Sequence, residues 1–340
     1  MATKTRFLTI FDYLRKPNHN ETLMSNKSNN QGRAYEFACL LTLNEKIGKI
    51  RPTIIVRNSS YDAAQKAWDT LSPEMQGIYR ISSLAAVSSI FKLEPRIIEP
   101  CKDILKLIIQ VDKKGEDGDV RDILIIRQEI EWEIGLSIKH NNFAAKHNRL
   151  SDKLDFGAKW YGVPCSETYW NDVRPVFDYL KKEKNKGTLF DELPDKEHDV
   201  YIPLLHAFFN EINRQSHEHP AIAGKLVEYI LGKYDFYKVI SVDRRSITQI
   251  QSYNLHGSLN QAANNKKAEI EIPIAALPTR IVSLDFKPGS TTTAELYLDG
   301  GWQFTFRIHN GDRRVLTSLK FDIRIIGMPT AIITLNCLWN

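Results

Sequence analysis

Two strand-like segments that follow each other between Gly118 and Ser151 constrain the fold of this chain more than any other feature. The first, Ile123–Ile126, is a short apolar run of the kind found in buried strands, and Asp122 stands directly before it. The second alternates strictly, with Trp132, Ile134, Leu136 and Ile138 on one face. Its other face carries acids and Lys139, because successive side chains of a strand point to opposite sides. The sequence therefore predicts two neighbouring strands that bring an acid and a lysine together.

Opposite charges gathered at neighbouring strands suit a magnesium site. Mg²⁺ prefers oxygen ligands, commonly one or two carboxylates together with water and substrate phosphate. A nearby lysine can orient or deprotonate an attacking water and offset negative charge that develops on a phosphate. An acid at Asp122 and a lysine at Lys139 on the next strand resemble the active site of the PD-(D/E)xK nucleases.

Composition sets only broad limits on this chain. Its 340 residues suffice for two domains and a sizeable core, and a net charge of +5 does not by itself establish a polyanionic partner. The four cysteines lie far apart without a CxxC pair, which favours reduced thiols over disulfides or a zinc site. No apolar run reaches the length of a membrane span, and the N-terminus has no signal-peptide pattern, so we expect a cytoplasmic protein without a membrane partner.

The pattern along the chain predicts three parts. Residues 1–31 form an N-terminal extension whose polar end, Asn18–Gln31, reads as a linker. Residues 32–236 form a mixed α/β core, and residues 237–340 form a mostly β portion. The expected helices are Gly32–Leu43, Asp62–Leu71, Pro73–Ala86 with Ser72 as N-cap, and Glu94–Val111. The expected strands of the last part are Ala268–Ile274, Ile281–Phe286, Thr293–Leu298, Trp302–Ile308, Leu319–Ile326 and Ala331–Leu338.

Longer segments add a more specific resemblance. The stretch EWEIGLSIKHNNFAAKHNRLS at Glu131–Ser151 resembles the HaeIII-type family of type II restriction endonucleases. The same resemblance extends to GRAYEF near Gly32, LDFGAKW at Leu154–Trp160, GWQFTFRIHN at Gly301–Asn310 and SLKFDIRIIG at Ser318–Gly327. It covers roughly residues 30–340 and leaves the first 30 residues outside.

The resemblance implies a PD-(D/E)xK restriction-endonuclease-like α+β core in residues 32–236, followed by a β portion that recognises DNA. It implies Mg²⁺-dependent hydrolysis of both strands of double-stranded DNA at a short palindrome, which for this family is GGCC cut at its centre to leave blunt ends. It also implies a functional pairing with a cognate DNA methyltransferase. Monomer and homodimer both stay open, because either can cut a palindrome.

The resemblance assigns catalytic roles to Asp122 and Lys139, with one departure from the motif. Two residues before the lysine, where the motif has an acid, stands Ser137. A hydroxyl is a poor substitute for a carboxylate on Mg²⁺, and Glu133 lies roughly 13 Å further back along the strand. The missing carboxylate is expected from Glu36 on the GRAYEF helix or from Asp155, with Glu133, Asp119 and Asp152 as further alternative metal ligands.

Two groups of side chains are expected to contact DNA. Basic residues position DNA through its phosphates, and Arg or Lys donors can read guanine in the major groove. The candidates after the second strand are Asn141, Asn142, Lys146, His147 and Arg149. The candidates in the β portion are Arg307, His309, Asn310, Arg313 and Lys320.

Two alternatives remain beside a site-specific endonuclease. One is another PD-(D/E)xK nuclease without a fixed cut site, and the other is a catalytically decayed DNA-binding protein, which Ser137 would favour. A plasmid digest in Mg²⁺ separates the three by discrete bands, irregular products or a gel shift without cleavage.

Overall fold

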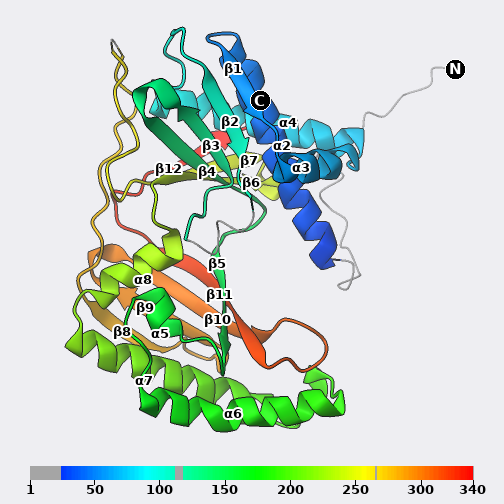
Figure 1. The fold of residues 1–340 in the computed structure, drawn as a ribbon, viewed down its shortest axis with the longest axis vertical. Coiled ribbons are helices and arrows are strands. Elements are labelled where there is room, and N and C mark those ends of the chain that lie inside the picture. Colours follow the sequence, from blue (N-terminus) through cyan, green and yellow to red (C-terminus); the bar gives the residue numbers. More distant parts are fainter. Residues whose placement is uncertain (1–23, 112–117, 265, 340) are drawn as a thin grey trace, which may run out of the picture.

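Two β-sheets organise the computed structural model, which describes residues 24–111, 118–264 and 266–339. A seven-stranded sheet has the order β1-β2-β3-β4-β6-β7-β12, and a five-stranded sheet has the order β5-β11-β10-β9-β8. Each sheet carries its own helices, which gives an upper and a lower lobe (Figure 1). The mixed α/β architecture expected from the sequence is confirmed.

In the described part of the chain, the upper lobe has three helices against one face of a mixed sheet. They are α2 (Met24–Gly48), α3 (Ser59–Asp69) and α4 (Pro73–Leu93). Its strands are β1 (Thr53–Val56), β2 (Leu105–Ile109), β3 (Ile123–Arg127), β4 (Trp132–His140), β6 (Phe236–Val242), β7 (Ile247–Tyr253) and β12 (Thr334–Leu338). Helix α4 begins as predicted, with Ser72 Oγ accepting a hydrogen bond from the Met75 N–H at 3.3 Å.

The lower lobe packs four helices against one face of an antiparallel sheet. They are α5 (Phe156–Trp160), α6 (Glu167–Lys186), α7 (Ile202–Glu218) and α8 (Ile222–Leu231). Its strands are β5 (Ala144–Ser151), β8 (Ile281–Phe286), β9 (Thr293–Leu298), β10 (Gln303–Asn310) and β11 (Ser318–Gly327). Short helical turns complete the two lobes at Gln128–Ile130, Phe190–Glu192, Glu197–Tyr201, Asp243–Arg245 and Asp299–Gly301.

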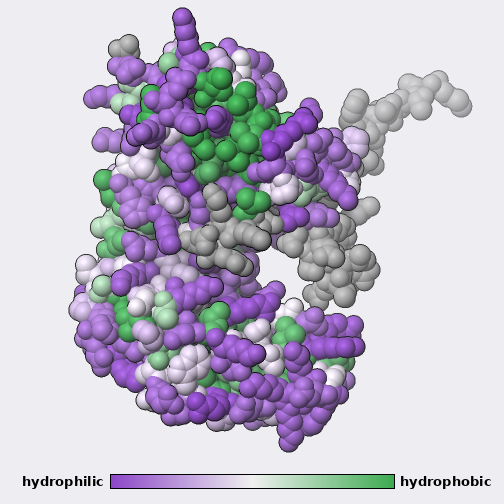
Figure 2. Space-filling view, viewed as in Figure 1, coloured by the Kyte–Doolittle hydropathy of each residue, from purple (hydrophilic) through white to green (hydrophobic). Residues whose placement is uncertain are grey.

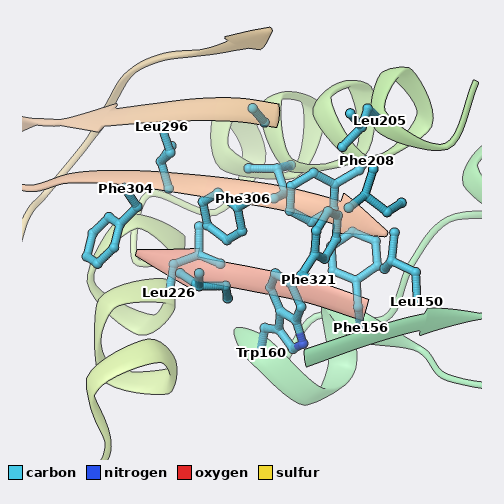
Figure 3. Packing of buried hydrophobic residues seen from close by; sticks show 14 of the residues in the cluster. Leu150, Phe156, Trp160, Leu205, Phe208, Leu226, Leu296, Phe304, Phe306 and Phe321 are labelled. Atoms are coloured by element: carbon cyan, nitrogen blue, oxygen red, sulfur yellow. The ribbon is translucent and has the colours of Figure 1, made fainter. Parts of the chain in front are cut away.

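Aromatic side chains fill the core of the lower lobe (Figure 3). The Phe208 ring lies 5.1 Å from both Phe156 and Phe321, measured between centroids, and Trp160 stacks on Phe306 at 6.3 Å. Large rings bury much apolar surface and prefer such tilted or offset contacts. This packing fixes one face of the five-stranded sheet and leaves its other face polar.

Helices α6 and α7 lie on the side of the lower sheet that is turned away from the upper lobe, whereas α5 and α8 lie in front of the sheet in this view (Figure 1). The polar face of the sheet is therefore turned toward the upper lobe. A hollow between the lobes opens on one side of the molecule (Figure 2). Among the described residues, no helix is both long and apolar enough to cross a membrane.

Several expectations about the elements are wrong. Residues 24–31 of the expected linker belong to α2, whereas residues 1–23 lie outside the described part. The end of the expected helix Glu94–Val111 is strand β2, and Ala268–Ile274 forms no strand. A run of apolar residues that is this short fits a strand and a helix equally well, so periodicity alone does not separate them.

The lobes also do not follow the division at residues 236 and 237. Strands β6, β7 and β12 come from the C-terminal part but complete the upper sheet. Helices α5–α8 come from residues 32–236, the expected nuclease core, but pack against the five-stranded sheet of the lower lobe. The chain therefore passes between the lobes repeatedly, after β4, α8, β7 and β11.

Candidate active site

Backbone hydrogen bonds fix Asp122 at the start of β3. The Asp122 N–H donates to the Leu136 carbonyl at 2.7 Å, and the Gln110 N–H donates to the Asp122 carbonyl at 2.9 Å. Asp122 is thus held between β2 and β4, beside the end of β4 that carries Lys139. The apolar face of β4 anchors this strand, since Trp132, Ile134, Leu136 and Ile138 are all buried in the upper core.

One carboxylate oxygen of Asp122 collects three donors. Its Oδ2 accepts from Lys139 Nζ at 2.9 Å, from the Ile138 N–H at 2.6 Å and from Ser137 Oγ at 3.4 Å. Its Oδ1 accepts no hydrogen bond from the part of the chain that the structure describes. The side chains of Lys139 and Asp122 are 28% and 24% exposed, so the pair is reachable from solvent.

Acids around Lys139 keep its side chain charged. Burial lowers the pKa of Lys139, but attraction by Asp122, the hydrogen bond that Lys139 donates to that carboxylate and attraction by Glu36 outweigh it, and the pKa is raised. Lys139 is therefore an ammonium ion at neutral pH. In this state it can donate hydrogen bonds and neutralise an anion, but it cannot accept a proton.

The acid–lysine pair opens into a cleft of about 470 Å³. Glu36 on α2 and Ser137 on β4 line the same cleft as Asp122 and Lys139. The lower lobe contributes Ala144, Ala145, Lys146 and His147 from β5. All four predicted catalytic residues thus meet in one cleft at the junction of the lobes.

The other acids near β3 and β4 are held by Arg121. Its guanidinium donates to Asp119 Oδ1 at 2.8 Å and to Glu133 Oε1 at 2.8 Å, and Asp119 also accepts from Gln110 Nε2 at 2.9 Å. Glu133 does not line the cleft, whereas Asp119 does. A Cβ on Gly135 would collide with the stem of Arg121, so this glycine lets the arginine cross β4.

Asp155 and Asp152 lie in the lower lobe and do not line the cleft. Asp155 is the N-cap of α5, where its Oδ1 accepts from the Ala158 N–H at 2.9 Å and from the Cys165 N–H at 3.0 Å. Asp152 pairs with Lys181 at 2.9 Å. The structure therefore favours Glu36 over Asp155 as the second carboxylate.

The donor set of this cleft fits Mg²⁺ with few protein ligands. Among the described residues, no three His, Cys, Asp or Glu side chains lie together as a metal cage. Asp122 Oδ1, the carboxylate of Glu36 and the Ser137 hydroxyl are hard oxygen donors of the type that Mg²⁺ takes, with water and phosphate completing its shell.

The residues after β4 that were predicted to contact DNA include some with structural hydrogen bonds and some that line the cleft. Asn141 adopts a left-handed conformation (φ 50°), and its Nδ2 donates to Asp243 Oδ2 at 3.0 Å. Lys146 donates to the Tyr229 carbonyl at 2.7 Å. Burial, with Lys159 and Lys233 nearby, lowers the pKa of Lys146 to about 8. Asn142 and His147 line the cleft, as does Lys146.

The remaining candidates lie at the lower sheet. Arg149 on β5 is exposed and donates to Ser318 Oγ at 2.9 Å. Arg307 and His309 on β10 and Lys320 on β11 alternate with buried core residues, so they stand on the polar face. Asn310 instead closes the following turn, with its Nδ2 donating to the Arg314 carbonyl at 2.7 Å. Arg313 is exposed in that turn.

Sequence reasoning missed Lys238, which lies directly beside Ser137 in the register of β6 and β4. Its Nζ donates to the carbonyls of Ala144 and Phe143 at 3.0 and 3.2 Å. Burial, reinforced by Lys139 and opposed by Asp122, lowers its pKa to about 7. A lysine inside the apolar run of β6 was the available signal, but only the register shows what it contacts.

Comparison with known proteins identifies the family of this chain. A model of the HaeIII restriction endonuclease family matches residues 32–329. The type II restriction enzyme HaeIII of Haemophilus aegyptius is 49% identical over 318 residues, which are 93% of this chain and 100% of that protein. No solved structure matches the chain. The resemblance carried by the motifs around Lys139 is thereby confirmed, and this chain belongs to the HaeIII family of type II restriction endonucleases.

Proposed function

We propose that this type II restriction endonuclease cuts both strands of DNA at GGCC, leaves blunt ends and requires Mg²⁺. The observation that carries the proposal is the convergence of Asp122, Lys139 and Glu36 in one cleft. The 49% identity to HaeIII supports the same recognition site. Asp122, Glu36 and Ser137 are the proposed holders of the ion.

The position of the cleft suggests how DNA lies on the molecule. The cleft is lined from β3 and β4 above and from β5 below, at the junction where the polar face of the lower sheet begins. A duplex in the hollow between the lobes would contact this face while its backbone reaches Asp122. Basic side chains there would position the phosphates.

Each residue of the cleft then has a separate task in hydrolysis. Mg²⁺, when bound, supplies a polarised water and offsets negative charge on the phosphate. Lys139, as an ammonium ion, holds an anionic oxygen and stabilises charge that grows on it. Ser137 and the Ile138 N–H keep the Asp122 carboxylate in one orientation. A proton acceptor other than Lys139 is required, because Lys139 is already protonated.

A plasmid digest with mapped ends tests this proposal. We expect discrete fragments with blunt ends inside GGCC in Mg²⁺ and intact plasmid in EDTA. Ends within another shared sequence would overturn GGCC but keep the endonuclease, and irregular products would overturn site specificity.

The enzyme is expected to act in the cytoplasm beside a cognate methyltransferase, and plasmid methylated within GGCC should resist cutting. Sedimentation with and without a GGCC duplex decides between monomer and homodimer.

A further inference from the structure

One acid stands among the bases on the polar face of the lower sheet. Asp322 on β11 faces His147 of β5 on one side and Arg307 of β10 on the other in the strand register. Lys320, two residues before it, faces Arg149 and His309. Its neighbours Phe321 and Ile323 are fully buried in the lower core, so Asp322 points to the opposite, polar side.

Two imidazoles lie against the Asp322 carboxylate, and that of His147 is hydrogen-bonded to it. His147 Nδ1 lies 2.7 Å from its Oδ1, and His309 Nε2 lies 3.2 Å from its Oδ2. Burial raises the pKa of Asp322, but the hydrogen bond from His147 and the attraction of both imidazoles outweigh it and lower the pKa. The group is therefore a carboxylate at neutral pH, and its side chain is still 25% exposed.

This position is connected to the cleft. His147, which contacts Asp322, also lines the cleft that contains Asp122 and Lys139. A duplex whose backbone reaches the cleft would therefore bring base edges near this part of the sheet. Each carboxylate oxygen has two lone pairs, so an imidazole on each oxygen leaves acceptor capacity for a further donor.

An acid on a DNA-facing surface repels phosphates, and a hydrogen bond from a donor on a base can offset this unfavourable interaction. In the major groove the donors are the amino groups of cytosine and adenine, and Asp or Glu characteristically accepts from cytosine N4. Half of the candidates for base contact found in the sequence are Arg or Lys side chains, which only donate and suit guanine O6 and N7. A face that reads a G·C pair needs one acceptor beside such donors.

We propose that Asp322 is this acceptor and takes a hydrogen bond from the N4 amino group of a cytosine in the recognition site. The inference rests on the proposed GGCC site. Asp322 would thus determine specificity, with His147 and His309 fixing its orientation before DNA arrives.

The test combines a change in the protein with a change in the base. After the cut site is mapped, each of its cytosines is replaced in both strands by 2-pyrimidinone deoxynucleoside, which lacks the amino group. The ratio of kcat/KM for normal and modified duplex is measured with the same enzyme preparation, so the fraction of folded enzyme cancels. The unaltered chain should discriminate at one cytosine by about 5- to 150-fold, the range expected for one base contact. Asp322→Ala should cut both duplexes within about twofold of each other.

Two variants separate recognition from structure and charge. Glu295→Ala removes an acid from the same face of β9, two strands away in the sheet, and should keep the discrimination. Asp322→Asn retains an acceptor oxygen and should keep part of the discrimination between normal and modified duplex. Unchanged discrimination by Asp322→Ala at every cytosine would overturn the proposal, as would a mapped site without cytosine. Irregular plasmid ends would overturn the proposed function itself.

Discussion

All three hydrogen bonds to the Asp122 carboxylate are accepted by one oxygen, Oδ2. This asymmetry suggests that the two oxygens have different functions. Oδ2 is committed to Lys139, Ser137 and the backbone of β4. Oδ1 faces no donor among the described residues and is suited to a cation. A single side chain can therefore orient the lysine and contribute a metal ligand.

Asp122→Ala and Lys139→Ala are each expected to lower the single-turnover cleavage rate by at least ~100-fold, the scale for loss of one well-placed electrostatic group. Binding of the cognate duplex should stay largely intact, because these side chains are proposed to serve the chemistry rather than binding. Lys106→Ala is the matched control, since this lysine lies on β2 outside the cleft and donates to Gln128. Near-normal cutting by either cleft variant would mean that the active site lies elsewhere.

Glu36→Gln and Asp155→Asn separate the two candidates for the second carboxylate. Glu36 lines the cleft and acts on Lys139, so Glu36→Gln should cost ~100-fold or more in rate and recover partly in Mn²⁺. Asp155 caps α5, so Asp155→Asn should lower stability by about 1 kcal/mol or less and leave the rate unchanged. Single-turnover rates and thermal unfolding measure both effects. Normal rates for both variants would move the role to Asp119 or Glu133.

The sequence predicted that the candidate catalytic residues on one hairpin lie together, but it did not predict the residues around them. Asp122, Ser137 and Lys139 follow from the alternation of β4 and the motif around it. Lys238 and Asp322 are reached only through strand pairing across about a hundred residues or more, which no local pattern records. The choice between Glu36 and Asp155 likewise depends on which lobe each helix joins.

At the scale of elements, β5 shows why a polar stretch was not recognised as a strand. Lys146 and Asn148 point toward α8, where Lys146 lies 3.7 Å from the centroid of the Tyr229 ring and Asn148 Oδ1 accepts from Tyr229 Oη at 3.0 Å. Tyr229 satisfies polar groups that period-two reasoning would place in solvent. The strand therefore lacks the apolar alternation on which sequence prediction relies.

The pairing of β5 with β11 predicts the salt dependence of DNA binding. Arg149→Ala and Lys320→Ala, on facing positions of these strands, should each weaken binding to all sequences alike. The logarithm of the binding constant decreases linearly with the logarithm of the salt concentration. If each side chain contacts one phosphate, the magnitude of this slope should decrease by about 1 in each variant. Lys181→Ala on α6, beneath the lower lobe, should leave the slope unchanged (Figure 1). Slopes that match the unaltered chain would exclude phosphate contact at these positions.

Lys238 connects β6 to the segment between β4 and β5 and predicts a pH dependence of stability. Its pKa of about 7 in the folded state lies below the value of about 10.4 in the unfolded chain. Between these values the unfolded state binds more protons, so the free energy of unfolding should rise with pH relative to Lys238→Met. The comparison is made by denaturant unfolding in EDTA. Parallel curves for the two proteins from neutral pH to about pH 10 would show that Lys238 titrates normally.

At the scale of the whole molecule, the two lobes are interleaved along the chain. The upper sheet takes strands from before β5 and after α8, and its last strand, β12, follows the entire lower lobe. The division at residues 236 and 237 was predicted from a change in pattern from helices to strands. That change is real, but secondary-structure content does not reveal which sheet a strand joins.

This interleaving predicts that residues 1–236 do not form an autonomous nuclease. The fragment would keep Asp122 and Lys139 but lose β7, β12 and nearly all of β6, which carries Lys238 and pairs with β4 beside Lys139. Tyr237 and Val239, which are fully buried in the upper core, would be lost with it, and β4 would become an edge strand with unpaired backbone groups. We expect the fragment to be unfolded or aggregated by circular dichroism and to have no Mg²⁺-dependent activity, whereas the full chain cuts at a fixed site. A folded fragment that cuts DNA in Mg²⁺ would show that the upper lobe does not need its C-terminal strands.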